Sequence, residues 1–110
     1  MKLGAPIAVL LVAAPAFARD PWTGIADSRD LTRSRAAARS GDYCGAQPRS
    51  ARARAEFRKR FPCPSTGEFR GACPGWVVDH IIALKRCGRD GQSNMAWQTK
   101  AQARKKDRWE

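Results

Sequence analysis

The pattern of apolar and polar positions is clearest in the C-terminal third of the chain. An apolar, mostly β-branched run, residues 76–78, leads directly into Asp79 and His80, the only histidine. Pro-Gly precedes this run, and a loop rich in Gly, Asp and Ser follows it and closes at Asn94. A β-branched run with such boundaries predicts a strand that enters a loop. We therefore expect Asp79 and His80 at a strand end, presented by a rigid element.

The residues after this loop predict a second strand and a helix. Residues 95–98 can form a short strand antiparallel to the first. Thr99 followed by Gln102 is a capping-box pattern, and the Ala- and Lys/Arg-rich run beyond it predicts a final helix from about Lys100. Residues 75–110 thus predict a strand–loop–strand–helix unit. Its main apolar contacts are expected from Trp76, Ile81, Trp97 and Trp109.

The region before this unit contains a first helical candidate. Asp27 or Ser28 can cap a helix that runs through Leu31 to Arg39, and three consecutive alanines favour it. The apolar spacing of this helix is poor. We interpret residues 19–48 as a basic N-terminal arm, partly helical and loosely attached, and residues 49–110 as the domain proper.

A second helical candidate covers residues 50–60, and the proline at position 62 ends it. Arg54 and Arg58 are four residues apart and share one face of this helix, while Phe57 and Phe61 share a neighbouring face. This spacing predicts a basic stripe beside an aromatic anchor. An ordinary amphipathic helix with Phe57 in the core is compatible with the same pattern.

Four cysteines lie between positions 44 and 87. An even number in a small exported chain favours disulfide bonds, although four cysteines allow three pairings. A bond between the two that flank the turn-rich segment 62–75 would staple it and stabilise the fold by about 3 kcal/mol. The spacing contains no CxxC pair, so a zinc site is the weaker alternative. The four cysteines are Cys44, Cys63, Cys73 and Cys87.

Residues 1–18 have the pattern of a secretory signal peptide. Lys2 is followed by an apolar segment, residues 5–14, that is too short to span a bilayer, and residues 16–18 fit the small-x-small cleavage rule. The alternative is an uncleaved membrane anchor. Cleavage before Arg19 would leave one small domain in the periplasm or the medium. Since no second long apolar run exists, we expect no stable membrane association after cleavage.

The composition is strongly basic. The formal net charge is +11 and the isoelectric point is about 10.6. Between residues 29 and 60 alone there are ten basic and three acidic residues. Such a charge predicts a polyanionic partner, which can be nucleic acid, an acidic membrane surface or an acidic protein. The charge by itself does not distinguish among these partners.

The chemistry-bearing residues of the C-terminal region recur in a known arrangement. An acid–histidine pair, Asp79 and His80, is followed by a loop containing Gly88 and Asp90, then by Asn94 and a basic helix. In this combination the region resembles the HNH endonucleases, the ββα-metal nucleases. The resemblance implies an α+β fold in which a small ββα-metal domain follows two helices and a disulfide-stapled loop.

The resemblance covers about residues 63–110 and implies a role for each motif residue. In the HNH family the residue before the key histidine binds a metal ion and the histidine is the general base. Carried over to this chain, Asp79 binds metal and His80 activates water. Asn94 is similar to the family residue that holds the loop and orients the histidine through a hydrogen bond.

One motif position departs from the family pattern. Many HNH proteins carry His or Asn nine residues after the asparagine, where this chain has Ala103. A further ligand of some members falls on Asp107, one helical turn later and on the same face. Asp79 and Asp107 would suit Mg²⁺ or Mn²⁺, with water completing the coordination. Asp90 is expected to form a turn rather than to bind metal.

The function expected from the resemblance is that of an exported, metal-dependent endonuclease that acts as a monomer on DNA, with RNA left open as a second substrate. Because phosphate contacts position a nucleic acid without specifying its sequence, we expect little sequence specificity and strong salt dependence. The main alternative is a non-catalytic, disulfide-stabilised protein that binds nucleic acid or another polyanion. A cationic membrane-surface protein would need a long apolar face, which we do not find. Whether an inhibitor protein exists stays open. The candidates for contacting the nucleic-acid backbone are Arg54, Arg58, Lys105 and Lys106.

Overall fold

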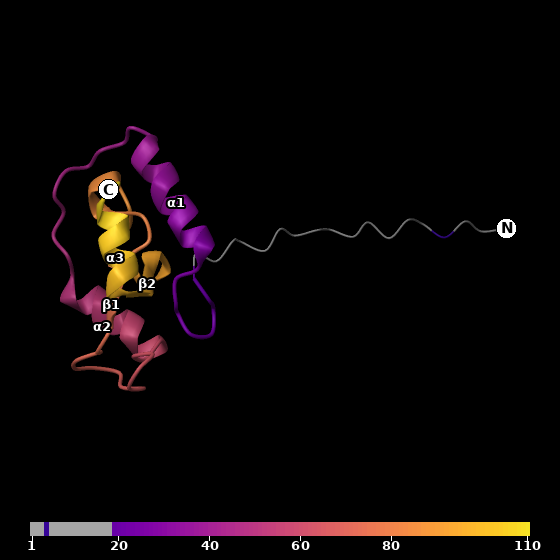
Figure 1. The fold of residues 1–110 in the computed structure, drawn as a ribbon, viewed down its shortest axis with the longest axis vertical. Coiled ribbons are helices and arrows are strands. Elements are labelled where there is room, and N and C mark those ends of the chain that lie inside the picture. The colour runs from indigo at the N-terminus through magenta and orange to yellow at the C-terminus, as the bar shows by residue number, and fades with distance from the viewer. Residues whose placement is uncertain (1–3, 5–18) are drawn as a thin grey trace.

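The structure is a computed structural model that describes Gly4 and residues 19–110. Apart from Gly4, the predicted signal peptide lies outside the described residues. The described part has three α-helices and a two-stranded antiparallel sheet, so the α+β class is confirmed (Figure 1). The helices are α1 (Ser28–Arg39), α2 (Ala51–Arg60) and α3 (Lys100–Asp107), and the strands are β1 (Trp76–His80) and β2 (Met95–Thr99).

All three helices begin where side-chain capping predicts. The Asp27 carboxylate accepts the backbone N–H groups of Arg29 and Asp30 at the start of α1. Thr99 and Gln102 form a reciprocal capping box at the start of α3, with both bonds 3.1 Å long. Ser50 caps α2 through a 3.1 Å bond to the N–H of Ala53. These caps satisfy backbone donors that a helix leaves unpaired at its first turn.

The register of the sheet decides which way the motif residues of β1 point. His80 lies opposite Met95, and Asp79 lies opposite Ala96. Since successive side chains of a strand alternate between faces, His80 shares the Met95 face and Asp79 shares the Ala96 face. The two neighbours in sequence therefore reach the strand end on opposite faces of the sheet.

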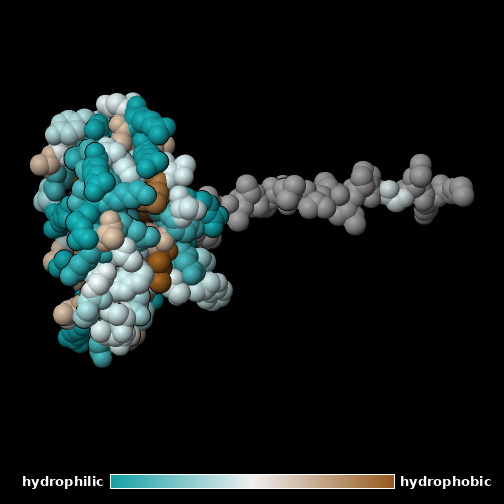
Figure 2. Space-filling view, viewed as in Figure 1, coloured by the Kyte–Doolittle hydropathy of each residue, from teal (hydrophilic) through white to brown (hydrophobic). Residues whose placement is uncertain are grey.

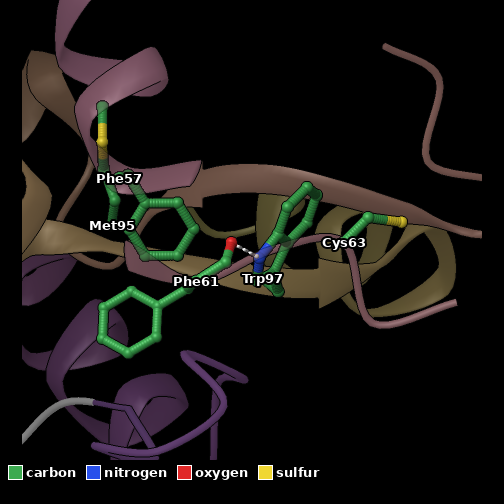
Figure 3. Packing of buried hydrophobic residues seen from close by; sticks show 5 residues of the cluster. All are labelled: Phe57, Phe61, Cys63, Met95 and Trp97. Atoms are coloured by element: carbon green, nitrogen blue, oxygen red, sulfur yellow. Dashed lines mark hydrogen bonds between the residues drawn. The ribbon is translucent and has the colours of Figure 1, made fainter. Parts of the chain in front are cut away.

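The larger hydrophobic core lies on the His80 face of the sheet, where α2 covers it. The Trp97 indole N–H donates to the Phe61 carbonyl over 2.9 Å (Figure 3). The Phe57 ring lies 5.2 Å from the Phe61 ring and 5.9 Å from the Trp97 ring, between centroids. The contact thus anchors α2, and the prediction of Phe57 in the core is confirmed. The buried cluster consists of Phe57, Phe61, Cys63, Met95 and Trp97.

The apolar residues expected in the C-terminal unit divide into two groups. Ile81 and Trp97 are fully buried, as predicted. Trp76 is half-buried at the edge of the core. Trp109 packs against α1 instead, where its indole N–H donates to Ser34 Oγ over 3.2 Å. Figure 1 accordingly shows α1 alongside the C-terminal part of the chain.

The expectation that the N-terminal region is loosely attached is wrong. The Trp97 N–H donates to the Gly24 carbonyl over 2.8 Å, and the Ala26 N–H donates to the Trp97 carbonyl over 2.9 Å. Gly24 has a φ of 71°, and a Cβ there would lie 2.6 Å from the Phe61 ring. Residues 24–26 therefore pair with the free edge of β2. Apolar spacing gave no sign of this contact, because backbone groups make it. The division between residues 48 and 49 stays a prediction.

Two disulfide bonds join the four cysteines. Cys63 pairs with Cys73 across the turn-rich segment, as the stapled loop requires. Cys44 pairs with Cys87 and attaches the segment between α1 and α2 to the β1–β2 loop. Two disulfides in so small a chain indicate an oxidising, exported environment. Within the described residues we find no helix with the length and apolar character needed to cross a membrane.

Candidate active site

The β1–β2 loop, residues 81–94, is held in place by Asn94. The Asn94 carboxamide accepts the N–H of Ile82 over 3.0 Å and donates to the Ile82 carbonyl over 3.0 Å and the Arg89 carbonyl over 2.8 Å. The Asn94 carbonyl accepts the N–H of Ile81. Three side-chain bonds from one buried amide fix both ends of the loop. The predicted role of Asn94 in holding the loop is therefore observed.

A glycine makes room for this amide. A Cβ on Gly88 would lie 1.9 Å from the Ile82 carbonyl oxygen and 2.9 Å from Asn94 Nδ2. Both distances are far below van der Waals contact, so the loop can close in this form only around a residue without a side chain. The preceding residue, Cys87, has a φ of 67° and is tied by its disulfide to Cys44.

His80 is bonded to a residue that sequence reasoning had assigned only to a turn. His80 Nε2 lies 2.8 Å from Asp90 Oδ1, and the imidazole is buried. The second oxygen, Asp90 Oδ2, accepts the N–H of Ser50 over 2.7 Å at the start of α2. Asp90, rather than Asn94, is therefore the residue bonded to the ring, and the predicted Asn94–His80 hydrogen bond is replaced by this one.

The Asp90 bond determines which ring nitrogen can accept a proton. The hydrogen bond to His80, together with that from the Ser50 N–H, holds the pKa of the Asp90 carboxyl below its ordinary value. An ionised carboxylate can only accept hydrogen bonds, so Nε2 must carry the hydrogen. In the neutral imidazole this leaves Nδ1 with a free lone pair. A base oriented by a carboxylate is the arrangement that proton-abstracting sites use.

Asp79 is paired with a buried lysine on α3. Its Oδ2 lies 3.2 Å from Lys106 Nζ, and its Oδ1 accepts the N–H of His80 over 2.8 Å. Lys106 Nζ also lies 3.0 Å from Glu110 Oε1 and donates to the His80 carbonyl. The prediction that Lys106 contacts nucleic acid is wrong, because Lys106 is 0 % exposed. Its ammonium ties α3 to the end of β1.

A hollow of about 300 Å³ opens beside these groups. Asp79 and His80 line it from β1, and Asp107 and Glu110 line it from the end of the chain. The structure thus brings Asp107 to the same hollow as Asp79, as expected from the helix spacing. Arg49, in the segment held by the Cys44–Cys87 disulfide, also lines this hollow.

The remaining basic candidates lie in different environments. Arg54 is exposed on α2 and lines a smaller hollow of about 150 Å³ that also reaches His80. Arg58 is half-buried, donates to the Gly71 carbonyl over 2.6 Å and lies 5.3 Å from the Trp97 ring centroid. Lys105 is exposed on α3. Arg54 and Lys105 are free to meet phosphate, whereas Arg58 is engaged with the Gly71 carbonyl and the Trp97 ring.

The carboxylates of the hollow offer few protein ligands for a metal ion. Among residues 19–110, no three His, Cys, Asp or Glu side chains are grouped so that they could hold a metal ion together. Asp79 and Asp107 nevertheless line one hollow and offer hard oxygen atoms. Mg²⁺ commonly binds through one or two carboxylates and keeps several waters. A Mg²⁺ or Mn²⁺ ion held by these two carboxylates would keep most of its waters, and Asp79 would share its oxygens with Lys106 Nζ and the His80 N–H, to which they are bonded here.

Comparisons with protein-family models, with curated proteins and with solved structures give no match. The likeness to HNH endonucleases therefore rests on the residues of this chain.

Proposed function

We propose that the protein is an exported, metal-dependent endonuclease of the HNH type that hydrolyses phosphodiester bonds in DNA with little sequence specificity; RNA stays open as a second substrate. The observation that carries the proposal is the His80–Asp90 pair at the end of β1, beside Asp79 and within reach of exposed arginines. The order β1, β2, α3 over residues 76–107 supports the ββα-metal assignment.

In the proposed reaction His80 is the general base. Its Nδ1 takes a proton from the attacking water, and Asp90 keeps the ring in the required tautomer and stabilises the charge that forms on it. Positioned acid–base groups of this kind accelerate reactions by about 10²–10⁴-fold. Asn94 and Gly88 fix the loop that carries Asp90, so they act by positioning.

Asp79 and Asp107 are the proposed ligands of the cation, which when bound would stabilise negative charge on the phosphate and the leaving oxygen. The Lys106 ammonium lies between the Asp79 and Glu110 carboxylates and offsets their negative charges. Arg49 and Arg54 would contact phosphates on either side of the scissile bond, since both line hollows that reach His80.

The test is plasmid cleavage by the oxidised chain from Arg19 to Glu110, with Mg²⁺, with Mn²⁺ and with chelator. Wild type should cut only with metal, and His80→Ala should fail to cut while still binding DNA. Asp90→Asn should cut slowly, because an amide can either donate to or accept from His80 Nε2. It therefore no longer holds the imidazole in the tautomer that leaves Nδ1 able to accept a proton. If the chain binds DNA tightly but never cuts it under any metal, the proposal fails.

That last outcome would favour the second candidate, a binding protein without catalysis. The net charge of +11 and the two disulfides support this alternative equally well. It leaves the His80–Asp90 bond without a purpose beyond loop stability. It therefore predicts that Asp90→Asn changes the stability of the fold and leaves DNA affinity unchanged.

A further inference from the structure

Three hollows adjoin one another, from the end of β1 at Asp79 and His80 onto the face of the sheet that α2 covers. The hollow beside Asp79 shares Arg49 and His80 with the second, which in turn shares Arg49, Arg54 and Val78 with a third. The third hollow is the largest, at about 560 Å³, and Trp76 lies in its wall. Because neighbouring hollows share lining residues, we treat the three together and call them the α2–β1 groove.

The two sides of the α2–β1 groove differ in chemistry. Arg49 and Arg54 are exposed along its α2 side. On its β1 side, Trp76, Val78 and His80 share one face because they are two residues apart. Trp76 is half-buried, and it both packs against the core cluster and lines the groove. The groove therefore offers positive charge along one side and an aromatic surface along the other.

We propose that the α2–β1 groove is a binding track for a single strand of nucleic acid, in which Trp76 stacks on an unpaired base and Arg49 and Arg54 contact the backbone. This inference rests on the proposed function and specifies its substrate. A basic groove with an aromatic platform is the usual design of single-strand binding, because every base has a π-face and the arginines follow the phosphates.

The geometry argues for an unpaired strand. Trp76 and His80 are four residues apart on β1, which is about 13 Å at the strand rise, so a base on Trp76 lies a few nucleotides at most from the reacting phosphate. In a duplex the bases are stacked and paired, and a tryptophan in the wall of a groove cannot reach their faces without unstacking them. The enzyme should therefore prefer single strands, loops and frayed ends.

Binding can be measured separately from cleavage by using the His80→Ala chain in chelator. The probes are a fluorescent oligothymidylate, the same oligonucleotide with abasic positions, and a hairpin duplex, compared by anisotropy at one salt concentration. We expect the oligothymidylate to bind more tightly than the duplex. Trp76→Leu should weaken its binding by about 5- to 150-fold, since stacking on an aromatic side chain is worth roughly 1–3 kcal/mol per base.

Controls separate stacking from a general loss of structure or charge. Trp76→Phe keeps a π-face and should retain most of the affinity. Trp22→Leu removes a tryptophan that is 89 % exposed outside the groove and should change nothing. The abasic probe has no base to stack, so it should bind the His80→Ala chain and the same chain with Trp76→Leu added with equal affinity. Equal affinity of the parent chain for duplex and single strand, or equal effects of the Trp76 and Trp22 changes, would overturn the proposal.

These outcomes do not depend on catalysis. If the wild-type chain fails to cut under any metal, the nuclease proposal is lost, while the affinities above still show whether the groove binds a single strand. If the chain cuts but the Trp76 variants bind oligothymidylate normally, the track is lost and the nuclease remains.

Discussion

Replacement of Lys106 by methionine tests the buried ion pairs that join α3 to β1. Lys106 is 0 % exposed and contacts Asp79, Glu110 and the His80 carbonyl. Methionine fills a similar volume without a charge, so the two carboxylates are left close together and uncompensated. Breaking a buried pair in this way costs about 3–5 kcal/mol. The side chains of Asp79 and Glu110 are 17 % and 11 % exposed, so we expect a loss near 3 kcal/mol.

Lys105→Met is the matched control, because it removes the same charge from the neighbouring, exposed position. Exposed substitutions of this kind usually change stability by less than about 0.5 kcal/mol. The assay is denaturant unfolding of the oxidised chain, followed by tryptophan fluorescence. Adding Asp79→Asn to Lys106→Met should recover part of the loss, since one stranded carboxylate disappears. If Lys105→Met and Lys106→Met unfold at the same denaturant concentration, the assignment of buried ion pairs is wrong.

Three further predictions concern stability and the loop. Burial raises the pKa of Asp30 to about 6, so the carboxyl ionises at a lower pH in the unfolded chain than in the folded one. The free energy of unfolding of wild type should therefore fall by up to about 3 kcal/mol, relative to that of Asp30→Asn, as the pH rises from about 4 to above 6. A difference between the two chains that does not change with pH would contradict this. Gly88→Ala should destabilise the fold by about 1–3 kcal/mol and slow any cleavage, since its Cβ meets the Ile82 carbonyl, whereas Gly91→Ala, with open space around its Cβ, should do neither. The double change Cys44→Ser with Cys87→Ser removes a disulfide that closes a separation of 43 residues, and it should lower the free energy of unfolding by about 4 kcal/mol. An unchanged free energy of unfolding would refute this.

The parts of the fold that the sequence predicted are those with local signals. Asp27, Ser50 and Thr99 cap the helices where their side chains can reach the first N–H groups. The β-branched run before Asp79 forms the strand that its boundaries indicate. In each case the signal and the structure lie within a few residues of each other, so no knowledge of the rest of the chain is needed.

The site depends on contacts between residues that are distant in sequence, and these contacts could not be predicted from the local pattern. Asp90 reaches His80 only because Asn94 and Gly88 shape the loop between them. The sequence predicts Lys106 as one of several basic residues on a helix, and its burial depends on Asp79 and on the His80 carbonyl, which are 27 and 26 residues away in sequence. Backbone pairing of residues 24–26 with Trp97 left no trace in the apolar pattern.

The most direct test of the central claim is cleavage of plasmid DNA by the oxidised chain with and without Mg²⁺ or Mn²⁺, beside His80→Ala in the same buffers. The account predicts metal-dependent cutting by wild type and none by His80→Ala, although both bind DNA with similar affinity. Undiminished cutting by His80→Ala would contradict the role of the base, and binding without cutting by wild type would contradict the nuclease itself.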